Sequence, residues 1–134
     1  MHNLNPISPL GNRELISKVV GPYTISEVTA YSLASYSLRK GSENDAKKKV
    51  EQFIGSSLPD VMGSNFGKIS SFWIGPSQWL IEAPIEIHED LASELSKVSM
   101  GKASITEQTD AWCRFDLKGS ELAKPLSLLC NVDA

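Results

Sequence analysis

The sequence predicts an α+β fold, in which a mostly antiparallel sheet is covered by helices on one face. Segments whose apolar residues recur at every second position, typical of strands, alternate with segments whose apolar residues recur at helical spacing. Glycine and proline stand between these segments, and short connections pair strands as hairpins. The resulting order, β-α-β-β-α-β-β-α, opens with the β-α-β-β-α-β arrangement of ferredoxin-like folds.

Residues 1–22 are predicted to be an N-terminal arm. They contain Pro6, Pro9 and Gly21, which oppose regular structure. The apolar side chains of the arm are expected to lie either on their own domain or on a partner. The remaining residues, 23–134, are expected to form a single α+β domain, because a chain of 134 residues suits one domain with a hydrophobic core.

The first strand is predicted over residues 24–39, which are rich in β-branched and aromatic residues. A helix is expected to follow, because Ala46, Val50 and Ile54 recur at helical spacing. Gly55 is a suitable C-terminal stop for this helix.

The middle of the chain is predicted to form a hairpin and a second helix. Strands at residues 68–74 and 78–83 are expected to pair around the turn Gly75-Pro76-Ser77. The apolar stripe of an amphipathic helix comes next, formed by Ile87, Leu91, Leu95 and Val98.

The last third of the chain is predicted to form two strands and a helix. The strands are expected at residues 103–107 and 112–117, around a turn near Asp110. Ser120 is the expected N-cap of the final helix. Pro125 is expected to kink that helix, because proline removes a backbone hydrogen bond.

The charge balance argues against nucleic acid as a partner. The chain has 16 acidic and 13 basic residues, and its basic cluster Lys47-Lys48-Lys49 is flanked by Glu43 and Glu51, as on a solvated helix face. No apolar run approaches the roughly 18 residues of a membrane span. The N-terminus lacks signal-peptide features, and two cysteines are too few for a disulfide framework. We therefore expect a cytoplasmic protein that binds neither nucleic acid nor membranes.

Catalytic residues, cofactor ligands and metal ligands are not predicted in this chain. Metal sites need His, Cys or carboxylates at set spacing, and a Ser or Cys nucleophile needs a neighbouring base. The histidines His2 and His88 and the cysteines Cys113 and Cys130 match neither pattern. Both cysteines are expected to be structural.

Three residues are candidates for contact with a partner. Trp112 and Arg114 alternate with Phe115 and Leu117 along a predicted strand. If the second pair packs on the helices, the first pair faces outward, and exposed Trp and Arg are enriched at protein interfaces. Trp79 alternates with its neighbours in the same way. The other interpretation is that the arm or a loop covers this face.

Four segments, in this order and spacing, resemble the gamma subunit of heterotetrameric sarcosine oxidase, over residues 25–134. They are Leu38-Arg39-Lys40-Gly41, the Trp-x-Gly-Pro-x-x-Trp-Leu hairpin from Trp73 to Leu80, the run from Ser104 to Asp110, and Lys118-Gly119-Ser120. That family in turn resembles the folate-binding aminomethyltransferases, which implies an α+β fold like their N-terminal part. Family chains continue past the last helix, so a C-terminal segment is expected to be missing after Ala134.

The resemblance implies a non-catalytic structural subunit. The parent complex oxidatively demethylates sarcosine to glycine in one-carbon metabolism. Its FAD, FMN, NAD, zinc and tetrahydrofolate are implied to belong to the partner subunits. The partners implied are the alpha, beta and delta subunits, chiefly alpha.

Two other functions stay open at this point. The chain could be a stand-alone folate-binding or aminomethyltransferase-like one-carbon protein that holds the pterin through a carboxylate such as Asp110. It could also form a homo-oligomer through an open sheet. Binding of tetrahydrofolate by the isolated chain separates the first possibility from a structural subunit.

Overall fold

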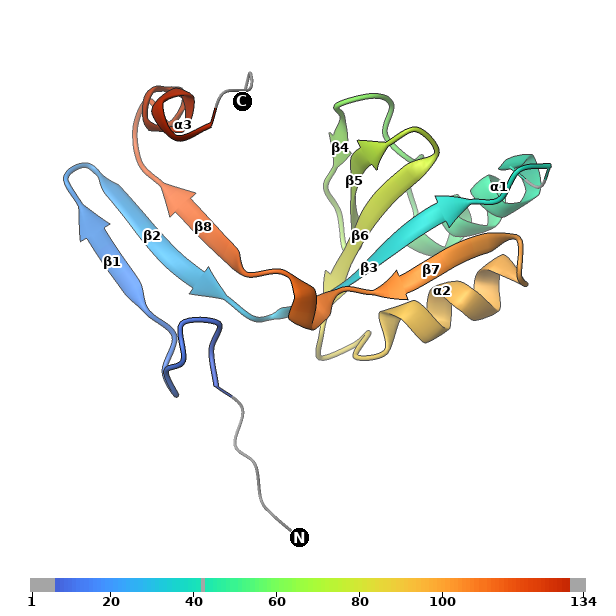
Figure 1. The fold of residues 1–134 in the computed structure, drawn as a ribbon, viewed down its shortest axis with the longest axis horizontal. Helices are drawn as coiled ribbons and strands as arrows, with labels where there is room; N and C mark the ends of the chain where they lie inside the picture. The colour runs from blue at the N-terminus through green and yellow to red at the C-terminus, as the bar shows by residue number, and fades with distance from the viewer. Residues whose placement is uncertain (1–6, 42, 131–134) are drawn as a thin grey trace, which may run out of the picture. The chain divides into compact units, whose positions relative to one another are not determined.

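The computed structural model describes residues 7–41 and 43–130, and it divides the chain into two compact units (Figure 1). Unit 1 combines Met1–Thr29 with Cys113–Ala134, and unit 2 is Ala30–Trp112. His2 lies outside the described residues. This division corrects the expected arm at 1–22 and single domain at 23–134.

The physical reason for the correction is that neighbouring segments pair with different strands. The predicted strand 24–39 is two strands, β2 (Tyr23–Val28) and β3 (Tyr31–Leu38), which belong to different sheets. Within the predicted arm, Ser17–Val20 forms strand β1 and pairs with β2.

Unit 2 contains the predicted ferredoxin-like arrangement. Its sheet has the order β4-β5-β6-β3-β7, with every neighbouring pair antiparallel. The other strands are β4 (Ser64–Asn65), β5 (Ser70–Gly75), β6 (Gln78–Pro84) and β7 (Ala103–Glu107). Helix α1 (Glu43–Ile54) joins β3 to the β4–β5 region, and α2 (Leu91–Ser99) joins β6 to β7. The α+β class and the helix-and-hairpin order are confirmed.

Both helices of unit 2 pack on the same face of this sheet. Tyr36 and Ile81 point to that face, and one hydrophobic cluster joins them to Val50 of α1 and Leu95 of α2. The buried Tyr36 hydroxyl donates to the Ala46 carbonyl at 3.1 Å and accepts from the Ser99 hydroxyl at 3.3 Å. Burial raises the pKa of Tyr36, against the effect of the Ser99 bond. One side chain therefore links the sheet to both helices.

The helix boundaries in unit 2 follow local signals. Gly55 adopts φ +76° and its N–H donates to the Glu51 carbonyl, so the predicted stop of α1 is confirmed. Helix α2 begins later than its apolar stripe suggested. Asp90 caps it by accepting from Ser93 N at 3.2 Å, and Ile87 is exposed before the helix.

Unit 1 is a three-stranded antiparallel sheet followed by a short helix. The strand order is β1-β2-β8, with β8 at Arg114–Lys118, and α3 spans Ala123–Leu129. The N-cap of α3 is Leu122, so the prediction of Ser120 is wrong. The prediction that Pro125 kinks the helix is also wrong. Pro125 lies in the first turn, where a backbone N–H has little or no intrahelical bond to lose.

Gly119 follows β8 at a close approach to the β1–β2 connection. A Cβ at Gly119 would lie 2.6 Å from Tyr23 Cδ1 and 2.8 Å from the Pro22 carbonyl oxygen. Because a backbone oxygen cannot move without disturbing the sheet, we expect Gly119→Ala to destabilise unit 1 by about 1–3 kcal/mol. Urea unfolding followed by circular dichroism measures this. The control is Gly75→Ala, whose Cβ would meet Gln78 Oε1 at 3.6 Å. Equal stability of the two variants would contradict the expected clash.

Candidate partner interface

One face of the unit 1 sheet carries five apolar side chains, and we call it the apolar face. In the strand register, Val20 lies opposite Tyr23, and Ile25 lies opposite Leu117. Phe115 lies two residues from Leu117 on β8. Directly opposed residues, and residues two apart on one strand, point to the same side of a sheet. The five side chains therefore share one face, together with Lys18 opposite Ile25 and Glu27 opposite Phe115.

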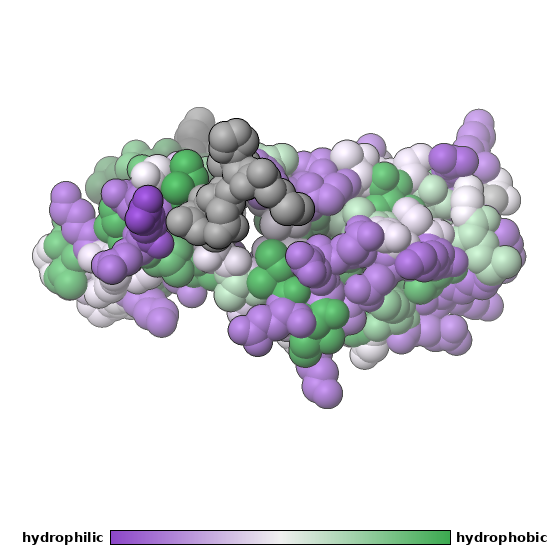
Figure 2. All heavy atoms as spheres, turned by 90° about the horizontal axis from the view of Figure 1, so that it is seen from below, coloured by the Kyte–Doolittle hydropathy of each residue, from purple (hydrophilic) through white to green (hydrophobic). Residues whose placement is uncertain are grey.

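Several side chains of the apolar face are open to solvent. Phe115 is 43% exposed, and Val20 and Ile25 are also large exposed hydrophobic residues. Figure 2 shows, on one side of the molecule, apolar residues (green) at the surface between polar ones (purple). Since an antiparallel sheet normally buries one face, and exposed apolar patches mark binding surfaces, this is the candidate interface.

The opposite face of the same sheet is more polar, although Val19 lies on it opposite Thr24. The hydroxyls of Ser17 and Ser26 hydrogen-bond at 2.7 Å, and Arg114 NH2 lies 3.3 Å from Asp116 Oδ1. Arg114 and Asp116 therefore form an ion pair on this face. Both side chains are partly exposed, so the pair contributes only about 0–1 kcal/mol.

Trp79 is not at an open face, which corrects the prediction for this residue. It is 7% exposed in the core of unit 2, and its Nε1–H donates to the Pro59 carbonyl at 2.9 Å. Alternation along β6 separates two faces but does not show which one the helices cover. Trp79 lies opposite Tyr36, and this is the helix-covered face.

Trp112 and Arg114 do not share a strand. Trp112 is 59% exposed and follows the 3-10 turn Thr109–Ala111, where its Nε1–H donates to Gln108 Oε1 at 3.1 Å. Arg114 is the first residue of β8 and lies on the polar face of unit 1. A role of either residue at an interface stays a prediction.

Sequence reasoning did not name Phe115 as a candidate for the interface. The alternation placed Phe115 and Leu117 on the helices if Trp112 and Arg114 face outward, but Phe115 is exposed. Both cysteines, Cys113 and Cys130, are exposed as well. The alternation of β8 was visible in the sequence. Its pairing with β2 was not, because those strands are far apart along the chain.

A buried carboxylate lies at one end of the apolar face. Glu27 is 5% exposed and lies opposite Phe115 in the register. Its Oε1 accepts from Leu10 N at 3.1 Å and its Oε2 from Ile16 N at 2.7 Å. The Ile16 N–H, above all, holds the pKa of Glu27 below its ordinary value; burial opposes this, and the Ser8 hydroxyl and Leu10 N–H add to it.

This lowered pKa makes the stability of unit 1 dependent on pH. A carboxyl whose pKa is lower in the folded state stabilises that state above its unfolded pKa, near 4.5 for Glu27, and loses this effect as pH falls through the folded pKa. We expect Glu27→Gln to be less stable than the natural chain at pH 7. The difference should shrink steadily as pH falls below 4.5, and urea unfolding at a series of pH values measures it. A difference that does not change with pH would contradict ionisation as its cause.

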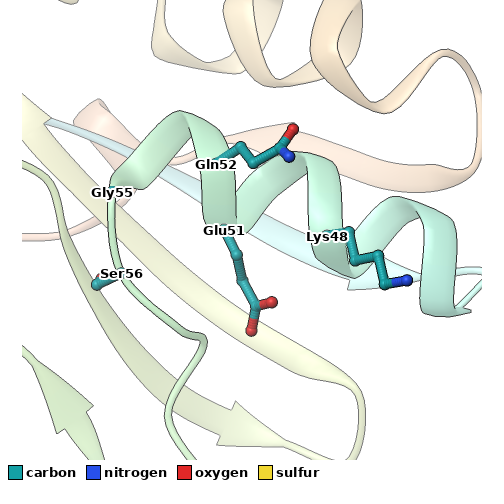
Figure 3. A pocket seen from close by; sticks show the side chains of 5 residues that line it. All are labelled: Lys48, Glu51, Gln52, Gly55 and Ser56. Atoms are coloured by element: carbon teal, nitrogen blue, oxygen red, sulfur yellow. The ribbon is translucent and has the colours of Figure 1, made fainter.

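A shallow hollow of about 450 Å³ lies beside α1 (Figure 3). Lys48, Glu51 and Gln52 border it, and their side chains do not converge on one point (Figure 3). Glu51 Oε1 instead accepts from Leu58 N at 2.9 Å. Among the described residues, no group of three or more His, Cys, Asp or Glu could hold a metal ion. None of the helices in that part of the chain is long and apolar enough to cross a membrane.

The fold and the apolar face together define a class: a small α+β protein with a ferredoxin-like unit and a second sheet that presents an apolar face. A solved structure shares this fold. It is described as "Heterotetrameric Sarcosine Oxidase from Corynebacterium sp. U-96 in complex with pyrrole 2-carboxylate", and one of its chains matches with a TM-score of 0.70 and 19% identity. The match covers 86% of the present chain and 60% of the other. No family model and no curated protein matches the sequence.

Proposed function

We propose that this chain is a non-catalytic structural subunit of a sarcosine oxidase complex, in the role of the gamma subunit. The observation that carries the proposal is the shared fold with a chain of a heterotetrameric sarcosine oxidase. The solvent-exposed apolar face of unit 1 supports it, because a subunit of a permanent complex needs such a surface. The complex would oxidatively demethylate sarcosine to glycine in the cytoplasm.

In this proposal the apolar face is the contact with the partner subunits, chiefly alpha. Phe115, Ile25 and Val20 would lie at the centre of the contact, since aromatic and aliphatic anchors carry most of the binding energy at interfaces. FAD, FMN, NAD, zinc and tetrahydrofolate would be held by the partner subunits. The present chain would stabilise those subunits without touching the reacting groups.

Co-expression with the alpha, beta and delta subunits from the same genome tests the proposal. We expect this chain to copurify in fixed ratio, and the complex without it to be less stable or to contain less flavin. A fully flavinylated, active complex assembled without this chain would contradict the proposal. Calorimetry with tetrahydrofolate is the companion measurement, because micromolar binding by the isolated chain would favour a stand-alone folate protein.

A further inference from the structure

Residues 7–16, which we call the strap, run from the first described residue to the start of β1. We propose that the strap is detachable, that Glu27 holds it at one end of the apolar face, and that its opening controls access of a partner to that face. The last part rests on the proposed function, whereas the first two parts concern the isolated chain.

The attachment is concentrated on one carboxylate. Leu10 N donates to one oxygen of Glu27 and Ile16 N to the other, at 3.1 and 2.7 Å. The Glu27 N–H in turn donates to the Ile16 carbonyl at 2.9 Å. Both oxygens of Glu27 are therefore engaged by the strap. Hydrogen bonds to a charged acceptor are stronger than neutral ones, so the loss of this charge weakens two contacts together.

The anchor point lies on the apolar face itself. Glu27 and Ile25 are two residues apart on β2 and point to the same side, and Phe115 lies opposite Glu27 on β8. A strap held at Glu27 therefore lies next to the aromatic centre of the candidate interface. Its release uncovers the Glu27 carboxylate and the end of the face beside Phe115.

The strap is not held by burial of its own apolar residues. Ile7, Leu10 and Leu15 are all more than half exposed. A local turn keeps the strap compact instead, with Ser8 N donating to the Asn12 carbonyl at 2.7 Å. Because opening of the strap exposes little buried apolar surface to water, it should cost less free energy than separation of the strands of unit 1.

Hydrogen exchange on the full chain tests the attachment of the strap to Glu27, which we call the latch. In the natural chain, the Leu10 and Ile16 amides should exchange with a weaker dependence on denaturant than the amides of β2. Glu27→Gln should accelerate exchange of those two amides about tenfold, and it should leave the stronger denaturant dependence of the β2 amides unchanged. Glu14→Gln is the matched control, because it removes an exposed carboxylate of the strap itself, and it should have no effect. Trypsin cleavage after Arg13 should be faster in Glu27→Gln than in the natural chain or in Glu14→Gln.

Two results would overturn the latch. One is exchange of Leu10 and Ile16 with the same denaturant dependence as β2, since the strap would then open only when the sheet unfolds. The other is unchanged exchange in Glu27→Gln. The first measurement uses the natural chain, so it decides the question even if the variant folds poorly.

Binding to the partner subunits tests the control of access. If the strap must open, Glu27→Gln should bind them more tightly, by up to about tenfold. Weaker binding would show that the closed strap is part of the interface and would overturn this role. If the natural chain binds none of the subunits, the proposed function fails, while the exchange measurements still decide whether the latch exists.

Discussion

Trp79→Ala is expected to lose about 3–5 kcal/mol of unfolding free energy, a large part of the roughly 5–15 kcal/mol that stabilises an ordinary domain. Trp79 fills the core of unit 2 beside Tyr36 and Ile81. Its removal leaves a cavity that the surrounding helices and strands cannot close. It also leaves the buried Pro59 carbonyl without its donor.

Two further variants separate these causes. Trp79→Phe keeps most of the volume and removes the Nε1–H donor, so it should cost about 1–3 kcal/mol. Trp112→Ala makes the same change as Trp79→Ala at an exposed site, and should alter stability by less than about 1 kcal/mol. Urea unfolding followed by circular dichroism measures all three. If Trp79→Ala were as stable as Trp112→Ala but failed to assemble with partners, Trp79 would be an interface residue after all.

Phe115→Asp is expected to weaken assembly with the partner subunits by about 2 kcal/mol or more, roughly thirtyfold in affinity. The change places a charge at the centre of the proposed contact, where it loses water on binding without gaining a partner. Phe115 is 43% exposed in the isolated chain, but the new aspartate would lie opposite the Glu27 carboxylate, so the folding stability of the variant is measured alongside its affinity. Affinity is measured by immobilising the alpha subunit and titrating the purified variants.

Thr24→Asp is the matched control for Phe115→Asp. Thr24 lies on the polar face of the same sheet, opposite Lys118, where a new carboxylate remains solvated. We expect its affinity to stay close to that of the natural chain. Binding that is lost in Thr24→Asp and kept in Phe115→Asp would place the interface on the polar face.

Elements that depend on neighbours in sequence were predictable. The bounds of β7 agree with the prediction, and the hairpin of β5 and β6 differs from it by two residues or fewer at each end. The apolar spacing also located α1 and α2, because a helix repeats its contacts every three or four residues. The candidate interface residues were predicted less well. Trp79 was placed on an open face but is buried, and Phe115 was placed against the helices but is exposed.

The sequence by itself determined which segments are helical, which are extended, and which side chains alternate along each strand. Only the tertiary structure decided that the segment at residues 24–39 divides between two sheets, that β2 joins β8, and which face of each sheet is covered. The physical reason is that alternation is a local property of the backbone. Burial instead depends on which distant segment packs against a face, and that information lies in no single stretch of the chain.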